Sequence, residues 1–153
     1  MRVIKRNTDL SVYPVKPSTT EEYFDLYKRY INIRHKDGDM YPADVEQFTS
    51  FLVNGREEGV FYEFRDNQKK LISIAVADKL TDGLSAIYTF FDPDAKTRSL
   101  GMFAILWLIQ KAQQEKLGHV YLGYWIKGSQ KMEYKIDYKP IELYVNGKWI
   151  TIA

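Results

Sequence analysis

The most informative absence in this sequence is cysteine, of which its 153 residues contain none. Without thiols, these residues hold no disulfide, no cysteine-ligated zinc or iron–sulfur centre, no thiol nucleophile and no redox switch. Histidine is nearly as scarce, since only His35 and His119 occur, far apart and outside any HExxH motif. They do not form the two-histidine zinc motif of a metalloprotease helix. We therefore expect neither a metal nor a cofactor in this chain.

Long hydrophobic runs are also missing. The longest covers residues 102–109, whereas a membrane-spanning helix needs about 20 apolar residues. The N-terminal MRVIKRNTDL lacks the apolar core of a signal peptide. We expect a cytoplasmic protein without a membrane partner. No sign of charge dominates, because 22 Lys and Arg against 20 Asp and Glu leave a net charge of +2, which permits a polyanionic partner without arguing for one.

What the sequence does contain is enough apolar surface for one packed core. Hydrophobic residues make up 45% of it and aromatic residues 15%, which is too apolar for a disordered chain. The length predicts a single domain. We assign residues 1–17 to an N-terminal strand or linker segment, where Pro14 and Pro17 confine any strand to a sheet edge or to short segments. Residues 18–153 then form the folded domain.

Hydrophobic periodicity predicts the order of helices and strands. The segment STTEE at 18–22 resembles a capping box and starts a helix with a tyrosine-rich face. A shorter helix has Pro42 at its first position and ends at Asn54-Gly55. The other predicted elements are strands over 61–65, 71–77 and 84–91, a helix over 97–116, an extended segment over 119–126, a short helix or turn over 129–135, and a hairpin over 138–152 turning at Asn146-Gly147.

This order predicts a mixed α/β (α+β) fold with a mostly antiparallel central sheet and helices on both faces. It resembles the acyltransferase fold of the GNAT superfamily. In that fold an arginine, two spacer residues and a glycine hold the pyrophosphate of the acyl carrier, and Arg98 and Gly101 keep this spacing. Free backbone N–H groups at a helix start favour an anion. The alternative is a helix cap with a surface arginine.

Five longer blocks of the sequence strongly resemble the C-terminal domain of the aminoacyl-tRNA:protein transferases. They are RHKDGDMYP (34–42), LTDGLSAIYTFFDPD (80–94), RSLGMFAILW (98–107), YLGYWIKGSQKMEYKIDYKP (121–140) and VNGKW (145–149). This family includes the arginyl-tRNA:protein transferases of eukaryotes and the bacterial aspartate/glutamate leucyltransferases, and the wording DGLSAIYTFFDPD is most similar to the bacterial branch. The resemblance covers most of residues 20–150.

The resemblance implies transfer of an amino acid, Leu or Arg, from its tRNA ester to the N-terminal α-amine of proteins that begin with Asp or Glu. In the family this reaction marks proteins for degradation by the N-end rule. Because an aminoacyl ester is already activated, the transfer requires no ATP, metal or covalent enzyme intermediate. Two other functions stay open: an acyl-CoA-dependent N-acyltransferase, and a non-catalytic binding module with this fold.

The resemblance also suggests roles on the donor side. We place the ester against residues 86–91, where a splayed strand offers a backbone N–H group to the developing oxyanion. The tRNA 3′ end is expected at Arg98, Ser99 and Gly101. Tyr88 and Tyr134 are candidates for stacking on the terminal adenine or for protonating the leaving ribose oxygen. For both tyrosines, packing in the core is the alternative.

On the acceptor side, the acidic N-terminal residue needs a cation and the ammonium group needs a carboxylate. The candidate cations are Arg34, His35, Lys131 and Lys135, and arginine has the bidentate geometry that a carboxylate prefers. Each of them is otherwise a solvated surface charge. For the ammonium group we select Asp92, which precedes Pro93 at the mouth of the expected site.

The absence of cysteine also bears on how much of the family's domain organisation this sequence contains. Full-length members of the family carry, before the resembling region, an N-terminal domain with a cluster of cysteines. The sequence is therefore expected to be a fragment or a naturally short member, with an incomplete surface for acceptor recognition.

Overall fold

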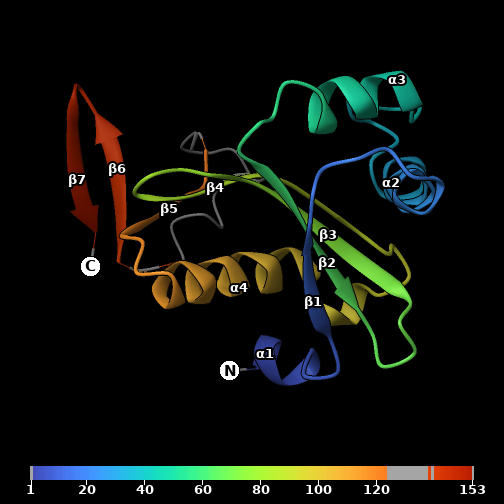
Figure 1. The fold of residues 1–153 in the computed structure, drawn as a ribbon, viewed down its shortest axis with the longest axis horizontal. Helices are drawn as coiled ribbons and strands as arrows, with labels where there is room; N and C mark the ends of the chain where they lie inside the picture. Colours follow the sequence, from blue (N-terminus) through green and yellow to red (C-terminus); the bar gives the residue numbers. More distant parts are fainter. Residues whose placement is uncertain (1, 124–137, 139, 153) are drawn as a thin grey trace. The chain divides into compact units, whose positions relative to one another are not determined.

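The computed structural model describes residues 2–123, 138 and 140–152. Contacts between residues divide the chain into two units, Met1–Tyr121 and Leu122–Ala153. Figure 1 shows the elements of the larger unit in chain order. They are α1 (Arg2–Arg6), β1 (Ser11–Val15), α2 (Glu21–Arg34), α3 (Val45–Phe48) continuing into the π-helical turn η1 (Thr49–Val53), β2 (Gly59–Arg65), β3 (Leu71–Lys79), β4 (Gly83–Phe91), the 3-10 turn η2 (Lys96–Arg98), α4 (Leu100–Gln114) and β5 (His119–Tyr121).

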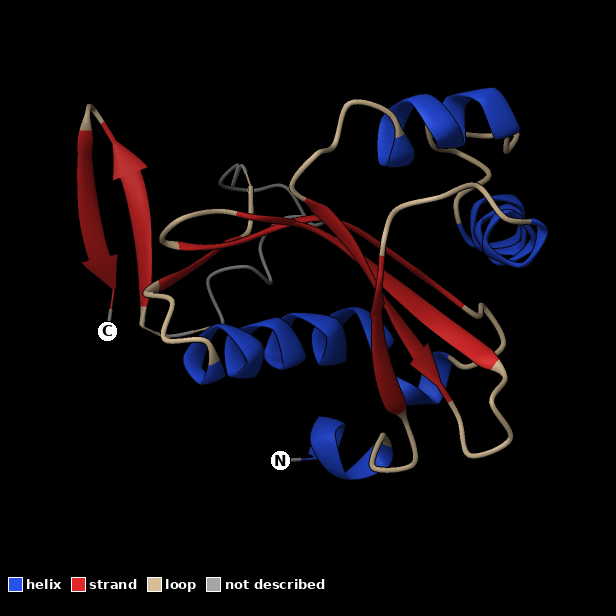
Figure 2. Cartoon of the chain, viewed as in Figure 1, coloured by secondary structure: helices blue, strands red, loops and turns tan. Residues whose placement is uncertain are grey.

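The strands of this unit form one five-stranded sheet in the order β1-β2-β3-β4-β5. The first four strands are antiparallel to their neighbours, and β5 is parallel to β4, which α4 makes possible by connecting the two (Figure 2). Pro14 lies in β1, at the edge of the sheet, where a missing N–H group is tolerated. The structure thus confirms the predicted edge strand and the mostly antiparallel sheet.

Helices cover both faces of the sheet, as predicted (Figure 1). On one face, α2 and the α3/η1 segment pack on Phe61, Ile74 and Phe90. On the other, α4 packs on Phe64 and alanine residues of β3. The first seven residues of β3, LISIAVA, are all buried, because the strand lies between these two layers.

The start of α2 follows from its sequence. The Thr20 side chain accepts a hydrogen bond from the Tyr23 N–H group at 3.1 Å, and two glutamates occupy the positive first turn. Tyr23, Tyr27 and Tyr30 are all buried on the sheet side of the helix. The tyrosine-rich face is therefore part of the core, as the helical spacing predicts.

Three local predictions need correction. The short helix begins at Val45 with Asp44 as its N-cap, so Pro42 lies before the helix rather than at its first position. The long helix begins at Leu100 rather than at residue 97, because Ser99 has a left-handed backbone (φ 53°) that separates η2 from α4. The helix α1 was not predicted, since five residues carry too little periodicity.

The strand β5 ends at Tyr121, short of the predicted 119–126 segment, and Leu122 and Gly123 are not in a strand. The rest of that segment and the predicted helix or turn over 129–135 lie outside the described residues.

The smaller unit contains a hairpin of β6 (Ile141–Val145) and β7 (Lys148–Ile152). Both turn residues have positive φ, 49° at Asn146 and 78° at Gly147, as in a type I′ turn. The structure confirms the predicted hairpin and its turn. Among the described residues of both units, no helix has the length and hydropathy that crossing a membrane demands.

Candidate functional site

The last part of β4 has an irregular edge. Tyr88 is opposite Val76 in β3, whereas Ala86 is opposite Ala77, so Ile87 is an extra residue that forms a β-bulge. On the other side, β5 pairs with β4 only over Gly83–Ser85. Within the part of the chain that the structure describes, residues 86–91 therefore have no strand partner on that edge.

Backbone N–H groups point toward this open edge. The Asp92 N–H group donates to the Ile72 carbonyl of β3 at 2.8 Å. Because N–H groups alternate in direction along a strand, those of Thr89 and Phe91 face away from β3. The open edge thus offers the backbone donors that the sequence analysis requires for an oxyanion.

Tyr88 extends from β4 into a cluster of aromatic rings. Its ring centroid lies 5.6 Å from Phe51 and 6.3 Å from each of Tyr27, Tyr30 and Phe90. Burial, followed by the nearby hydroxyls of Tyr30 and Tyr27, raises the pKa of Tyr88. The half-buried phenol therefore stays protonated at neutral pH and is able to donate a hydrogen bond.

Phe91 links several predicted site residues at the end of β4. The exposed Arg34 guanidinium lies 5.0 Å from the Phe91 ring centroid, in a cation–π contact. Tyr30 contacts both Phe91, at 4.9 Å, and His35, at 4.7 Å between ring centroids. A Cβ atom on Gly101 would lie 3.9 Å from Phe91 Cε1, an ordinary contact distance. Four predicted residues, namely Tyr88, Arg34, His35 and Gly101, are thus connected through Tyr30 and Phe91.

Asp92 is buried and its charge is already balanced. Its Oδ1 atom accepts hydrogen bonds from Arg29 at 2.8 Å and from the Asp94 N–H group at 2.9 Å. Its Oδ2 atom lies 3.6 Å from Lys70 Nζ. These contacts hold the turn after β4, and they favour a supporting function for Asp92 over direct contact with an acceptor ammonium group.

Arg98 and Ser99 face the N-terminal segment. Arg98 donates two hydrogen bonds to the carboxylate of Asp9, at 2.8 and 2.9 Å. This pairing lowers the pKa of Asp9 and raises that of Arg98. The Ser99 hydroxyl accepts a hydrogen bond from Arg6 at 3.2 Å. The predicted donor-side residues therefore contact α1 and the turn that follows it.

Tyr134, Lys131 and Lys135 lie outside the described residues, so their predicted functions remain predictions. Tyr30, Arg29 and Arg6 also contact the predicted site residues, although none of the three was predicted from the sequence. No local signal identifies the two arginines, because each contacts partners more than 60 positions away, in the segment 92–99. Residues 2–123 and 140–152 contain no group of three acidic or histidine side chains placed to hold a metal.

Comparison with known proteins identifies the family of this chain. The family model described as "Arginine-tRNA-protein transferase, C terminus" matches residues 22–145. The chain belongs to this family. The match begins within α2, so α1 and β1 lie before the matched region.

The curated relatives of this chain are bacterial aspartate/glutamate leucyltransferases, in agreement with the branch of the family that was predicted. The aspartate/glutamate leucyltransferase of Pseudomonas fluorescens (strain SBW25) is 55% identical over 151 residues, and that of Pseudomonas syringae pv. syringae (strain B728a) is 54% identical over the same length. Each alignment covers 99% of this chain but 64% of the relative. The chain therefore spans slightly less than two thirds of the proteins it matches.

Solved structures confirm the predicted GNAT acyltransferase fold. The ribosomal-protein-S18-alanine N-acetyltransferase from Escherichia coli has a TM-score of 0.57 and 15% identity, over 87% of this chain and 79% of that one. A ribosomal-protein-alanine N-acetyltransferase from Brucella melitensis biovar Abortus 2308 has a TM-score of 0.58 and 11% identity, over 94% and 98%. At these identities the likeness shows the fold alone.

Proposed function

We propose that this chain is the part of an aminoacyl-tRNA:protein transferase that moves Leu, or alternatively Arg, from its tRNA to the N-terminal α-amine of proteins beginning with Asp or Glu. The observation that carries the proposal is the 55% identity to an aspartate/glutamate leucyltransferase over 99% of this chain. Leu is placed first because the relatives are named leucyltransferases, and Arg second because the family model is named for arginine-tRNA.

The reaction asks little of the protein beyond positioning. The amine nitrogen attacks the ester carbonyl, a C–N bond forms, and the C–O bond to the tRNA ribose breaks, while one amine proton reaches the leaving ribose oxygen, either directly or through a hydroxyl group that donates its own proton to that oxygen and takes the amine proton in return. A free α-amine with a pKa of about 7.7 to 8.0 is roughly 10 to 20% neutral at pH 7. Placing the amine against the ester and excluding water from it are the main requirements.

The end of β4 provides groups for this chemistry. The backbone N–H groups of Thr89 and Phe91 face the open edge and would stabilise the oxyanion if the ester carbonyl lies against residues 86–91. Tyr88 is protonated and half-buried, so it would donate to the leaving ribose oxygen. Asp92 would hold the turn beneath the site through Arg29.

We assign acceptor recognition to the residues at the end of α2. Arg34 is exposed, and the Phe91 ring beneath it fixes the position of its guanidinium. An arginine held in this way would bind the carboxylate of an N-terminal Asp or Glu through two parallel hydrogen bonds, in bidentate geometry. His35 follows directly, and Lys131 and Lys135 are the other candidate cations. Arg98, Ser99 and Gly101 mark the expected approach of the tRNA 3′ end.

The direct test is transfer of radiolabelled Leu from tRNA-Leu, and of Arg from tRNA-Arg, onto a peptide that begins with Asp. A peptide that begins with Gly is the acceptor control, and the full-length Pseudomonas fluorescens relative is the enzyme control. We expect label on the Asp peptide only, with Leu exceeding Arg. Equal label on the Asp and Gly peptides would refute the proposal, whereas no transfer by this chain alone would not, because it spans 64% of the length of the active relative.

The fold supports one other candidate, an N-acyltransferase that uses acyl-CoA, because the solved structures that match are N-acetyltransferases. Thermal unfolding separates the two. A rise in Tm with coenzyme A, and none with aminoacyl-tRNA, would favour the acyl-CoA reaction.

A further inference from the structure

A hollow lies beside the start of α4. Its volume is about 510 Å³, it is open to solvent, and it is lined by Arg6, Thr97 and Arg98. Among the described residues, two of the three that line it are arginines and none is acidic. Such a lining suits an anion.

The two arginines differ in what their guanidinium groups already bind. Both Nη atoms of Arg98 are bonded to Asp9, and Asp66 adds a further attraction, so the charge of Arg98 is compensated within the protein. Arg6 uses only Nη1, which donates to the Thr97 carbonyl at 2.8 Å and to the Ser99 hydroxyl at 3.2 Å. Among the described residues, no carboxylate forms an ion pair with Arg6, and no hydrogen bond uses its Nε or Nη2 atoms. Arg6 therefore carries the uncompensated charge of the hollow.

Buried contacts fix the position of Arg6. The next residue, Asn7, is 2% exposed; its side-chain amide donates to the Val3 and Arg98 carbonyls at 2.8 and 2.9 Å, and its oxygen accepts from Arg98 at 3.2 Å. Arg98 also donates to the Arg6 carbonyl at 3.4 Å. The pair of Arg98 and Asn7 thus ties α1 to the turn before α4, and this tie sets where the Arg6 guanidinium lies.

We propose that Arg6 contacts a phosphate group of the tRNA strand in this hollow, and that Arg98 acts as a positioning residue that holds α1 against the start of α4. This inference rests on the proposed function, because it takes tRNA as the polyanion. It assigns a binding function to a residue before the matched family region, which begins at residue 22. It also gives Arg98 a way in which it would affect tRNA use although Asp9 already occupies its guanidinium.

Salt dependence of tRNA binding tests this inference. The probe is a fluorescently labelled, uncharged tRNA-Leu transcript with its 3′-CCA end, titrated with the full chain between 50 and 200 mM salt. Arg6→Gln keeps a hydrogen-bond donor for the Thr97 carbonyl but removes the charge, and Arg6→Lys keeps the charge. Lys5→Ala is the matched control, since Lys5 is an exposed cation of the same helix that does not line the hollow. Each variant is checked for an unchanged Tm.

One phosphate contact contributes about 0.7 to the steepness of the fall of log K with log salt concentration for a single strand, and about 0.9 for a B-form duplex. We expect Arg6→Gln to lower the steepness by about 0.7, so that its loss of affinity relative to the parent shrinks by about 2.6-fold between 50 and 200 mM salt. Arg6→Lys should keep the parent slope, and Lys5→Ala should change it by less than half as much as Arg6→Gln.

Equal slopes for the parent and Arg6→Gln, or equal losses in Arg6→Gln and Lys5→Ala, would overturn the inference and leave the proposed function standing. A parent chain that does not bind the transcript at all would overturn the inference together with tRNA as the amino acid donor.

Discussion

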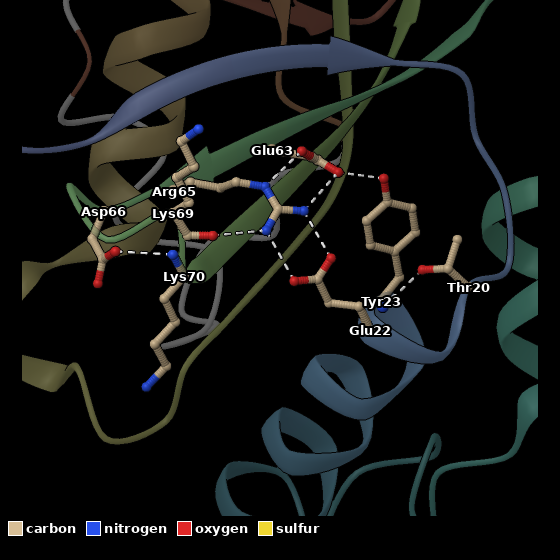
Figure 3. A network of polar contacts seen from close by, with 8 residues as sticks. All are labelled: Thr20, Glu22, Tyr23, Glu63, Arg65, Asp66, Lys69 and Lys70. Atoms are coloured by element: carbon tan, nitrogen blue, oxygen red, sulfur yellow. Dashed lines mark hydrogen bonds and ion pairs between the residues drawn. The ribbon is translucent and has the colours of Figure 1, made fainter.

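Replacement of Arg65 by methionine is expected to destabilise the larger unit by about 3 kcal/mol at pH 7, because Arg65 holds together a buried polar network (Figure 3). Its Nε atom donates to Glu63 at 2.9 Å, and its Nη2 and Nη1 atoms donate to the Glu22 carboxylate at 2.7 and 2.9 Å. The Tyr23 hydroxyl donates to the same Glu63 carboxylate. Glu63 lies in β2 and Tyr23 in α2, so the network ties α2 to the sheet.

The magnitude follows from burial. The side chains of Arg65 and Glu63 are 18% and 9% exposed, whereas that of Glu22 is 53% exposed. Removing one partner of a buried ion pair costs about 3 to 5 kcal/mol, because the other charge stays behind. An exposed pair contributes about 0 to 1 kcal/mol. We assign the loss to Glu63 and take the lower end of the range, since Tyr23 still donates to it.

The pH dependence has a defined sign. Burial raises the pKa of Glu63, but the hydrogen bonds from Arg65 and Tyr23 outweigh it, and its pKa lies below the usual value; the pKa of Glu22 is also lowered, by Arg65. Carboxylates with a lowered pKa stabilise the folded state above their unfolded pKa of about 4.3, and this stabilisation is lost as the pH falls through the folded value. Without the hydrogen bond from Arg65, burial raises the pKa of Glu63. Glu63 therefore becomes protonated at a higher pH in the variant than in the parent.

Urea unfolding at pH 7, 5 and 4, followed by circular dichroism, measures these free energies. The difference between the parent and Arg65→Met should be about 3 kcal/mol at pH 7 and should shrink toward pH 4. The double variant Glu63→Gln/Arg65→Met should recover most of the loss, and Glu22→Gln alone should cost less than about 1 kcal/mol. A difference below 1 kcal/mol, or one that does not change with pH, would refute the reasoning.

Three further predictions concern the candidate site. Tyr88→Phe keeps the ring packing but removes the hydroxyl, so kcat for transfer should fall by about 100-fold with little change in KM or Tm, and an unchanged kcat would exclude Tyr88 as a proton donor. Arg34→Ala should lower kcat/KM for an Asp peptide about 10-fold more than for a Gly peptide, whereas equal losses would indicate a structural function. Arg98→Ala should raise the KM for aminoacyl-tRNA without unfolding the protein; unchanged transfer at limiting aminoacyl-tRNA would contradict its assignment.

Elements with a strong local signal were predictable from the sequence. The capping residues before α2, the continuous apolar run of β3 and the Asn146-Gly147 turn each specify their structure within a few residues. The start of α4 was placed three residues too early, because nothing in the sequence signals that Ser99 has a left-handed backbone. That conformation accompanies contacts with Arg6, far away in the chain.

The candidate site shows the same limit. The sequence blocks identified Arg34, Tyr88, Asp92 and Arg98 as residues of interest, but not what they contact. Arg98 binds Asp9 and Asp92 binds Arg29, and these pairs form only when the chain has folded. A resemblance to a family points to positions, whereas the burial and pairing of each side chain determine whether its charge is available to a ligand.

The arrangement of helices around β4 would let the proposed donor and acceptor groups meet at Phe91. The helix α2 ends there with Arg34, and Gly101 lies there in the first turn of α4, so two helix ends of opposite polarity lie at the end of one strand. The N-terminus of α4 has a partial positive charge, which favours the phosphate groups and the oxyanion, and the C-terminus of α2 has a partial negative charge, which favours an ammonium group. Because α2 and α4 cover opposite faces of the sheet, Arg34 and the residues at the start of α4 approach the same strand from two sides, with Tyr88 on the side of α2.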